Sequence, residues 1–257
     1  MMPDWEKEKY RLHAKLPVHK RRLQRTCEII KAALGEIAKP YAAISFGKDS
    51  MVMAHLLIQH MPDIPMVWSD RGEEAELPET YAYINEVKKK YNLNLEIVKP
   101  EISQFEIYRR YGLPDVDEGV TRAIVTQINL IRVFAKYTKE NGNDGYFQGL
   151  RADESQGREK MARSYGPLFL RKKDNMIVCN PLLWWTGRDI WAYIVANEIP
   201  YHPEYDNDRF KNRELVRLSN WSGLYMARKG RVAELKYYHP ELYRKLVKEF
   251  PEVSRLV

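Results

Sequence analysis

The stretch YAAISFGKDSMVMAHLL, residues 41–57, decides the fold of this chain. It begins with mostly apolar residues, passes through a short polar turn and continues with a helical apolar pattern. A turn of this kind joins a buried strand to a helix whose first amides have no acceptor within the helix. Together with the helix dipole, such amides form a cradle for phosphate. We therefore predict a strand over 41–46, a helix over 50–60 and a phosphate-binding loop between them.

The residue types in the turn suit that purpose. Gly47 allows a ligand to approach the backbone closely, Ser45 and Ser50 add hydroxyl donors, and Lys48 adds a compact positive charge. Asp49 would repel phosphate directly, so we expect it to cap the turn or to reach Mg²⁺ carried by the phosphates. The alternative is an ordinary turn in which Ser45 or Asp49 is the N-cap. The P-loop pattern GxxxxGK[ST] is absent.

Strands and helices alternate along much of the chain, which indicates a doubly wound, mainly parallel α/β sheet with helices on both faces. Ligands bind to such sheets at the carboxyl ends of the strands. We divide the chain into an N-terminal helical segment (1–40), a nucleotide-binding α/β domain (41–203) and a helical C-terminal extension (204–257). Further strands are expected at 64–69, 94–98 and 144–150, a hairpin at 166–182, and helices at 5–38 with a break near Pro17, 77–91, 121–142 and 186–198 with Thr186 as N-cap.

Composition limits the class of protein. The 257 residues are 44% hydrophobic and 30% charged, which predicts a globular, soluble chain. No apolar run approaches the roughly 20 residues that span a bilayer, and the N-terminus lacks a signal-peptide core, so we expect a cytoplasmic protein without membrane contact. The net charge of +7 suits a polyanionic partner such as ATP or nucleic acid. The basic clusters are equally explained as solvated faces; they lie at 19–25, 171–173 and 227–231.

The chain has two cysteines, Cys27 and Cys179. They are too few for a disulfide framework, a four-cysteine zinc site or an all-cysteine iron–sulfur cluster. Cys27 falls on an apolar stripe with helical spacing, which predicts a buried thiol.

The segment ISFGKDS, residues 44–50, resembles the PP-loop of the adenine-nucleotide alpha-hydrolase superfamily, whose usual form is SGGxDS. Phe46 stands where the first of the paired glycines is usual, a variation also common in the phosphoadenosine phosphosulfate (PAPS) reductase branch. The resemblance implies binding of ATP-like phosphates by Ser45, Phe46, Gly47, Lys48, Asp49 and Ser50. It also implies cleavage between the α- and β-phosphates.

Three further stretches are similar to that branch and occur in the same order. WSDRGEEAELPETY (68–81) contains Asp70, and GLRADESQGR (149–158) contains Gly149, Arg151 and Arg158. The resemblance assigns Asp70, Gly149 and Arg151 to nucleotide binding, and the guanidinium forks of Arg151 and Arg158 suit phosphate or sulfate. The third stretch covers 180–206. Taken alone, Asp70 is a turn carboxylate, the arginine stretch is a salt-bridged loop, and the aromatic residues of the third stretch are core.

The sequence departs from the reductases at one decisive point. PAPS reductases use a nucleophilic cysteine near their C-terminus, whereas these 257 residues hold no cysteine after Cys179. Thiol attack needs a reachable thiolate, so reductase chemistry is disfavoured. What remains is attack by an acceptor oxygen on the α-phosphorus of ATP, with pyrophosphate leaving. Lys48, Asp49, Arg151 and Arg158 are the candidate catalytic residues that position groups and supply charge.

Several functions are compatible with these residues. The first is an ATP pyrophosphatase or adenylyltransferase in sulfur metabolism or in nucleic-acid sulfur modification, such as DNA phosphorothioation with a cysteine desulfurase partner. Aromatic and basic residues of the C-terminal tail motivate the nucleic-acid partner: Trp221, Tyr225, Arg228, Lys229 and Arg231. The alternatives are a sulfate adenylyltransferase small subunit with a GTPase partner, a non-catalytic nucleotide-binding module, and a reductase that uses Cys179 or a partner's thiol.

Overall fold

Strand β1 (Pro40–Ile44) lies inside a six-stranded sheet with the order β3-β2-β1-β4-β6-β5. This computed structural model describes residues 1–113, 122–207, 212–216, 218 and 231–257. The sheet is parallel except for β5, which pairs antiparallel with β6. The other strands are β2 (Met66–Ser69), β3 (Leu95–Val98), β4 (Gly145–Gln148), β5 (Leu168–Arg171) and β6 (Met176–Cys179). Because the chain adds strands first on one side of β1 and then on the other, strand order reverses between β1 and β4.

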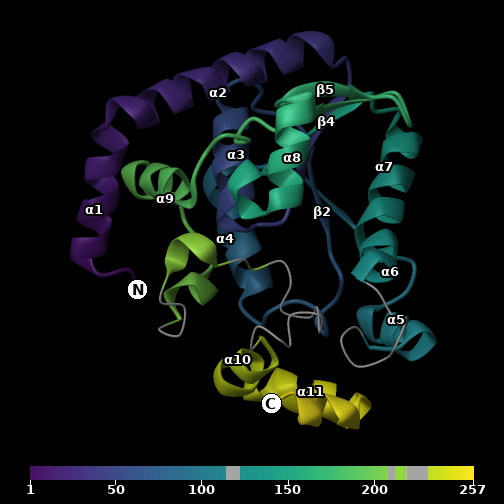
Figure 1. Ribbon diagram of the computed structural model, residues 1–257. Coiled ribbons are helices and arrows are strands. Elements are labelled where there is room, and N and C mark those ends of the chain that lie inside the picture. The colour runs from purple at the N-terminus through teal and green to yellow at the C-terminus, as the bar shows by residue number, and fades with distance from the viewer. Residues whose placement is uncertain (114–121, 208–211, 217, 219–230) are drawn as a thin grey trace.

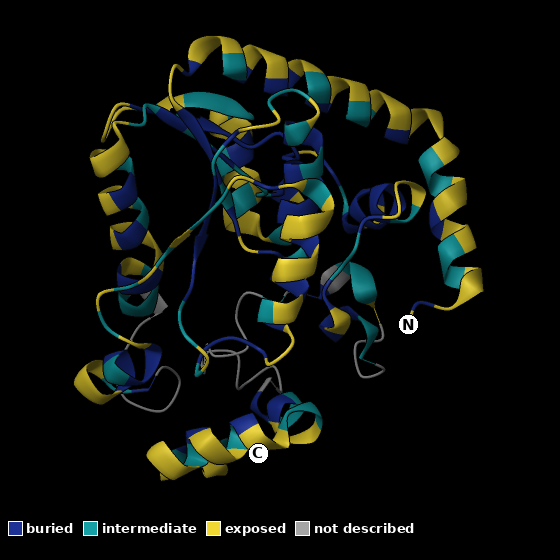
Figure 2. Cartoon of the chain, turned by 180° about the vertical axis from the view of Figure 1, so that it is seen from behind, coloured by how far each residue is buried: buried dark blue, intermediate teal, exposed yellow. Residues whose placement is uncertain are grey.

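Helices cover both faces of the sheet (Figure 1). One face packs against α2 (Pro17–Glu36), α3 (Lys48–Ile58), α4 (Thr80–Tyr91) and α9 (Gly187–Ala196), which share the largest apolar core. The other face is covered by a helix in three parts, namely α6 (Arg122–Thr126), the π-helical η1 (Gln127–Arg132) and α7 (Val133–Asn141). Figure 2 shows the buried positions of these helices turned inward. The doubly wound α/β architecture predicted from the sequence is therefore confirmed.

Local signals placed several elements correctly. The predicted hairpin is formed by β5 and β6, and the chain breaks at Leu16 so that Pro17 begins α2. Thr186 caps α9, where its hydroxyl accepts from the Asp189 amide. Short polar side chains at such positions replace the missing acceptors of the first helical turn.

Other boundaries differ from the prediction. Helix α4 begins at Thr80 instead of residue 77, because Leu77 to Glu79 form a turn that precedes it. The helix predicted over 121–142 is interrupted by the π-helical η1, and residue 121 lies outside the described residues. Two helices were not predicted at all, α5 (Gln104–Tyr111) and α8 (Gln156–Tyr165). Both are short, and each begins at a serine N-cap, Ser103 for α5 and Ser155 for α8, a local signal that the prediction passed over.

The buried carboxylate of Asp189 in α9 binds side chains of both N-terminal helices, α1 (Asp4–Lys15) and α2. Asp189 accepts from His13 Nε2 at 2.9 Å and from His19 Nδ1 at 3.1 Å, and it pairs with Arg22 at 2.5 Å. Burial alone would raise the pKa of Asp189, but hydrogen bonds from His19, Thr186 and His13 outweigh burial and lower it. Part of the basic cluster 19–25 is therefore structural.

The C-terminal helices, α10 (Arg231–Tyr238) and α11 (Pro240–Glu249), are followed by η6 (Pro251–Leu256) and lie beyond the carboxyl edge of the sheet (Figure 1). They share a second apolar core with α5, and Arg109 of α5 pairs with Glu249 at 2.8 Å. Tail residues 221–230, for which we predicted nucleic-acid contacts, lie outside the described residues, and the division into three segments stays a prediction. None of the helices in the described part of the chain has the length and apolar character needed to cross a membrane.

Candidate functional site

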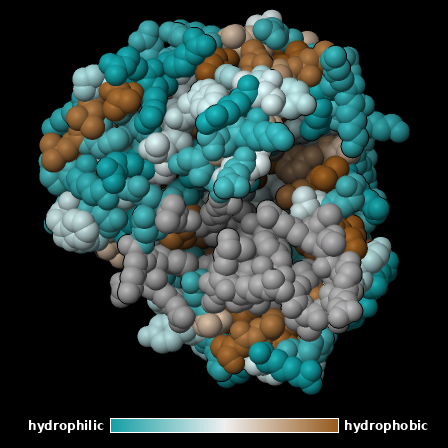
Figure 3. All heavy atoms as spheres, viewed as in Figure 1, coloured by the Kyte–Doolittle hydropathy of each residue, from teal (hydrophilic) through white to brown (hydrophobic). Residues whose placement is uncertain are grey.

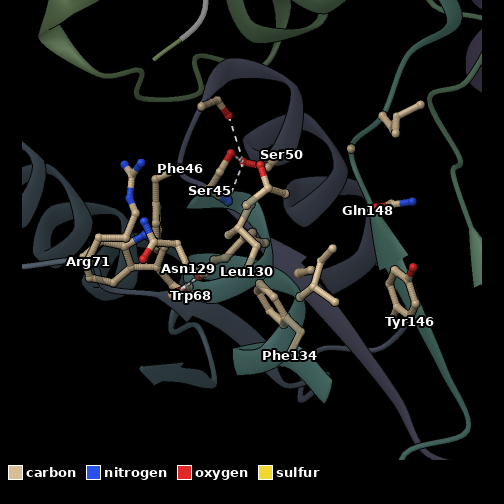
Figure 4. Close-up of a pocket in the computed structure, with 18 of the residues that line it drawn as sticks. Ser45, Phe46, Ser50, Trp68, Arg71, Asn129, Leu130, Phe134, Tyr146 and Gln148 are labelled. Atoms are coloured by element: carbon tan, nitrogen blue, oxygen red, sulfur yellow. Dashed lines mark hydrogen bonds between the residues drawn. The ribbon is translucent and has the colours of Figure 1, made fainter. Parts of the chain in front are cut away.

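A cavity of about 810 Å³ opens beside the loop that follows β1. Its walls come from the loops after β1, β2 and β4, from the sheet face, and from η1 and α7 across from that face (Figure 4). Figure 3 shows apolar side chains recessed between α8 and α7. The cavity therefore lies where strand order reverses, which is where open α/β sheets bind their ligands.

The loop after β1 is held by its own hydroxyl groups. Ser50 Oγ accepts from the Ser45 amide at 3.2 Å and donates to the Gly47 carbonyl at 3.0 Å. Ser45, Phe46, Gly47, Asp49 and Ser50 all line the cavity. The first amides of α3 have no acceptor inside the helix, so this end of the cavity has the donors that an anion needs.

Phe46 has a left-handed backbone, with φ of 54°. This conformation suits the glycine that the PP-loop pattern usually has at the position and is costly for phenylalanine. The ring is 1% exposed and contacts Trp68 and Tyr83 edge to face, with centroids 5.9 and 6.4 Å apart. Aromatic packing thus stabilises a strained backbone.

We expect Phe46→Gly to lower the free energy of unfolding by about 2 to 3 kcal/mol. Loss of a buried aromatic costs roughly 3–5 kcal/mol, and relief of the left-handed backbone returns about 1–2 kcal/mol. Phe46→Ala loses the same packing without that relief, so it should be less stable than Phe46→Gly by about 1 kcal/mol. Urea unfolding of the two variants measures both values, and a Phe46→Ala protein as stable as wild type would contradict this account.

Lys48 lies behind the loop instead of lining the cavity. Its side chain is 1% exposed, and Nζ donates to the Val216 carbonyl at 2.7 Å and pairs with Asp49 at 3.2 Å. Its amide donates to the Tyr205 hydroxyl at 2.9 Å. In this arrangement Lys48 braces the inner side of the loop, and its contact with phosphate stays a prediction.

Asp49 connects the loop after β1 to the loop after β4. Arg151 Nε donates to Asp49 at 2.6 Å, and the same guanidinium binds Asp153 at 2.5 Å. Burial works against the Asp49 carboxylate, but Lys48 and Arg151 outweigh burial and lower its pKa. Asp49 is therefore ionised, and Arg151, which does not line the cavity, is its buried partner.

Arg158 of α8 lines the cavity and pairs with Glu154 of η2 (Ala152–Glu154). Each carboxylate that lines the cavity in the described chain contacts a basic side chain: Asp49 with Arg151, Glu76 with Arg71, Glu154 with Arg158, and Asp174 with Arg171. A magnesium site needs carboxylate oxygens that are not already engaged by cations. The described residues therefore form no magnesium site in this arrangement of side chains, and Asp49 as a ligand of phosphate-borne Mg²⁺ stays a prediction.

The two other residues assigned by resemblance have structural positions. Asp70 accepts from the Gly72 amide at 2.9 Å and from the Tyr81 hydroxyl at 2.7 Å, and it is not part of the cavity wall. Gly149 lines the cavity, and a Cβ built there would lie 3.0 Å from the backbone of Asp49 and of Ser50. Gly149 thus permits the loop after β4 to approach the loop after β1.

Neither cysteine lines the cavity. Cys179 is fully buried in β6 and belongs to the core on the opposite face of the sheet, and burial raises the pKa of its thiol. Cys27 is half-buried on α2, and burial raises its pKa as well. Both thiols are therefore protonated at neutral pH and lie away from the site.

Several residues of the site were not identified by the sequence analysis. Arg71, Gln104 and Asn129 line the cavity but belong to no periodic or spaced pattern that marks them as ligands. Tyr205 of η3 (Pro203–Asp206) lies within the third stretch, 180–206, yet the bond that its hydroxyl accepts from the Lys48 amide has no sequence signal.

His202 is buried at the wall of the cavity. Its Nδ1 accepts from the Glu204 amide at 3.1 Å, so the proton is on Nε2, which donates to Thr80 Oγ1 at 3.1 Å. Burial lowers the pKa of His202 to about 4.

This shift predicts acid lability. Below about pH 6.5 the unfolded chain protonates His202 and the folded chain does not, so stability falls until the pH reaches the folded value. Between pH 7 and pH 5 we expect His202 to remove about 2 kcal/mol of the free energy of unfolding. His202→Gln should flatten that decline in urea titrations at the two pH values, and an unchanged slope would refute the assignment.

Comparison with known proteins shows the family of this chain. The family described as phosphoadenosine phosphosulfate reductase domain matches residues 39–245. The chain belongs to this family. A PAPS reductase from Synechococcus sp. is 31% identical over 186 residues, which cover 71% of this chain and 76% of that protein. One from Xanthomonas oryzae is 30% identical over 63% of this chain and 64% of its own length, so the match spans slightly under two thirds of that relative.

Two solved structures share the fold of this chain. A PAPS reductase from Candida auris, solved with phosphate, has a TM-score of 0.55 at 21% identity and covers 70% of this chain and 83% of its own. The U34-tRNA thiolase NcsA from Methanococcus maripaludis, with its [4Fe-4S] cluster, has a TM-score of 0.53 at 15% identity. That alignment covers 92% of this chain and 80% of the thiolase. These likenesses confirm the α/β fold.

Proposed function

We propose that this member of the PAPS reductase domain family cleaves ATP between the α- and β-phosphates and transfers the adenylyl group to an acceptor. One observation carries the proposal. The loop of Ser45 to Ser50 opens into the cavity, while neither cysteine lines it. The site thus has the donors for nucleotide phosphates but no thiol of its own for attack on a sulfonucleotide.

In this proposal some residues bind the nucleotide and others hold the loop in position. Amides at the start of α3, with the hydroxyl groups of Ser45 and Ser50, bind phosphate oxygens. Arg158 exchanges Glu154 for the nucleotide and stabilises charge as it develops on the leaving pyrophosphate. Asp49, held by Lys48 and Arg151, fixes the loop, so that the acceptor oxygen meets the α-phosphorus in line.

The names of the relatives favour a second candidate, reduction of a sulfonucleotide. With Cys179 fully buried, the thiol would have to come from a partner protein or a small dithiol. Adenine-nucleotide binding is common to both candidates, so the two differ in the bond that breaks and in the need for a thiol.

Product analysis separates these functions and identifies the acceptor class. Purified protein is supplied with ATP and Mg²⁺ alone, with sulfate, with DNA or with tRNA, and pyrophosphate and phosphate are measured separately. We expect pyrophosphate, with release stimulated by the acceptor. Stimulation by sulfate would indicate sulfate activation, as in a small subunit that works with a GTPase. Stimulation by nucleic acid would indicate sulfur modification beside a cysteine desulfurase. Phosphate as the sole product, or no product in any arm, would refute α,β-cleavage by this chain.

A further inference from the structure

Two buried carboxamides form part of the cavity wall. Gln104, at the start of α5, is 1% exposed, and Asn129, in η1, is 3% exposed. Asn129 Nδ2 donates to Gln104 Oε1 at 2.5 Å, so the two side chains form one unit. We call them the amide pair.

The amide pair has hydrogen-bonding capacity that the described residues do not use. Neither Gln104 Nε2 nor Asn129 Oδ1 has a partner among them, and both atoms are shielded from water. If both carboxamides are flipped, Gln104 Oε1 and Asn129 Nδ2 become the unpaired atoms. One donor and one acceptor therefore remain without a partner in either orientation. Buried polar groups are rarely left unpaired in folded proteins, because each costs stability.

The backbone holds the amide pair beside the end of β2. The Asn129 carbonyl accepts from Ser69 Oγ at 2.9 Å, and Asn129 stands within the π-helical turn, a feature frequent at functional sites. Figure 4 shows Asn129 beside Trp68 and Arg71, with Leu130 and Phe134 further along the same helix. Trp68 and Leu130 also line the cavity, so flat apolar surface adjoins the amide pair.

We propose that the amide pair binds the 6-amino edge of the adenine base. This rests on the proposed function, because it takes an adenine nucleotide as the ligand. Adenine presents a ring-nitrogen acceptor next to its amino donor, and a carboxamide donor and acceptor match those two positions. The spare atoms are shielded from water, so this contact requires the Asn129 carboxamide to turn toward the cavity.

The test compares ATP with purine riboside triphosphate, which lacks only the 6-amino group, by calorimetric titration. Wild type should bind ATP roughly 10- to 100-fold more tightly, and Gln104→Met/Asn129→Leu should bring that ratio within about threefold of unity. The double variant removes both partners, so no polar group is left unpaired and its melting temperature should equal or exceed that of wild type. Gln127→Ala removes an exposed carboxamide from the same π-helical turn and should change neither quantity.

The outcomes separate this inference from the proposed function. An unchanged preference for ATP in the double variant, whatever its melting temperature, would overturn the adenine contact. That result would leave α,β-cleavage standing. Failure of the wild type to bind either nucleotide would overturn both proposals.

Discussion

Asp49→Ala is expected to lower the rate of pyrophosphate release by about 100-fold or more. Asp49 is the shared partner of Lys48 and Arg151, and it lies where the loops after β1 and β4 meet. Without it, buried Lys48 and Arg151 each lose a carboxylate contact, at a cost of roughly 3–5 kcal/mol, and the loop after β1 loses its fixed position. Stopped assays of pyrophosphate with saturating ATP measure the effect.

The control keeps the same arginine and removes a carboxylate outside the cavity. Asp153 also binds Arg151, but its side chain is 42% exposed and does not line the cavity. Because exposed ion pairs contribute about 0–1 kcal/mol, Asp153→Asn should slow release by no more than about fivefold. Equal losses in the two variants would mean that Asp49 acts only by stabilising Arg151.

Gly149→Ala is expected to damage both stability and turnover. The added methyl group would lie 3.0 Å from the Asp49 carbonyl carbon and the Ser50 amide nitrogen, which are backbone atoms that cannot rotate away. Overpacking of this kind costs about 1–3 kcal/mol, and a shift of the loop by a fraction of an ångström should reduce turnover at least about tenfold. Thermal unfolding and pyrophosphate release are measured on the same preparation.

A second glycine in the same sequence stretch provides the comparison. Gly157 lies in α8, and a Cβ built there would meet no atom within 4 Å. Gly157→Ala should therefore stabilise the helix by about 0.5–1 kcal/mol and leave turnover unchanged. A Gly149→Ala protein that behaves like Gly157→Ala would show that the approach of the two loops does not matter.

The sequence predicts the strands and helices around β1 because the local signals in that part of the chain agree with one another. The apolar run before Gly47, the polar turn and the helical pattern after it are consistent with β1, the loop and α3. Thr186 and Pro17 likewise act within one helical turn. Predictions of this kind depend on neighbours in sequence, which the chain displays directly.

What the sequence did not predict depends on contacts between distant residues. Whether Lys48 reaches phosphate or supports the loop is decided by Val216 and Tyr205, more than 150 residues away. The π-helical turn that places Asn129 against Gln104 has no periodicity to find, because it breaks the spacing on which such predictions rest. Arg151, a phosphate ligand by resemblance, likewise pairs with Asp49 across 102 residues of sequence.

The most direct test of the account uses a protein without thiols. Cys27→Ser/Cys179→Ala removes both cysteines of the chain, neither of which lines the cavity. Pyrophosphate from ATP and sulfite from phosphoadenosine phosphosulfate are measured in parallel, without an added dithiol. We predict pyrophosphate at the wild-type rate and no sulfite from either protein. Sulfite from the wild type that disappears in the variant, without pyrophosphate from ATP, would contradict the account and make this chain a thiol-dependent reductase.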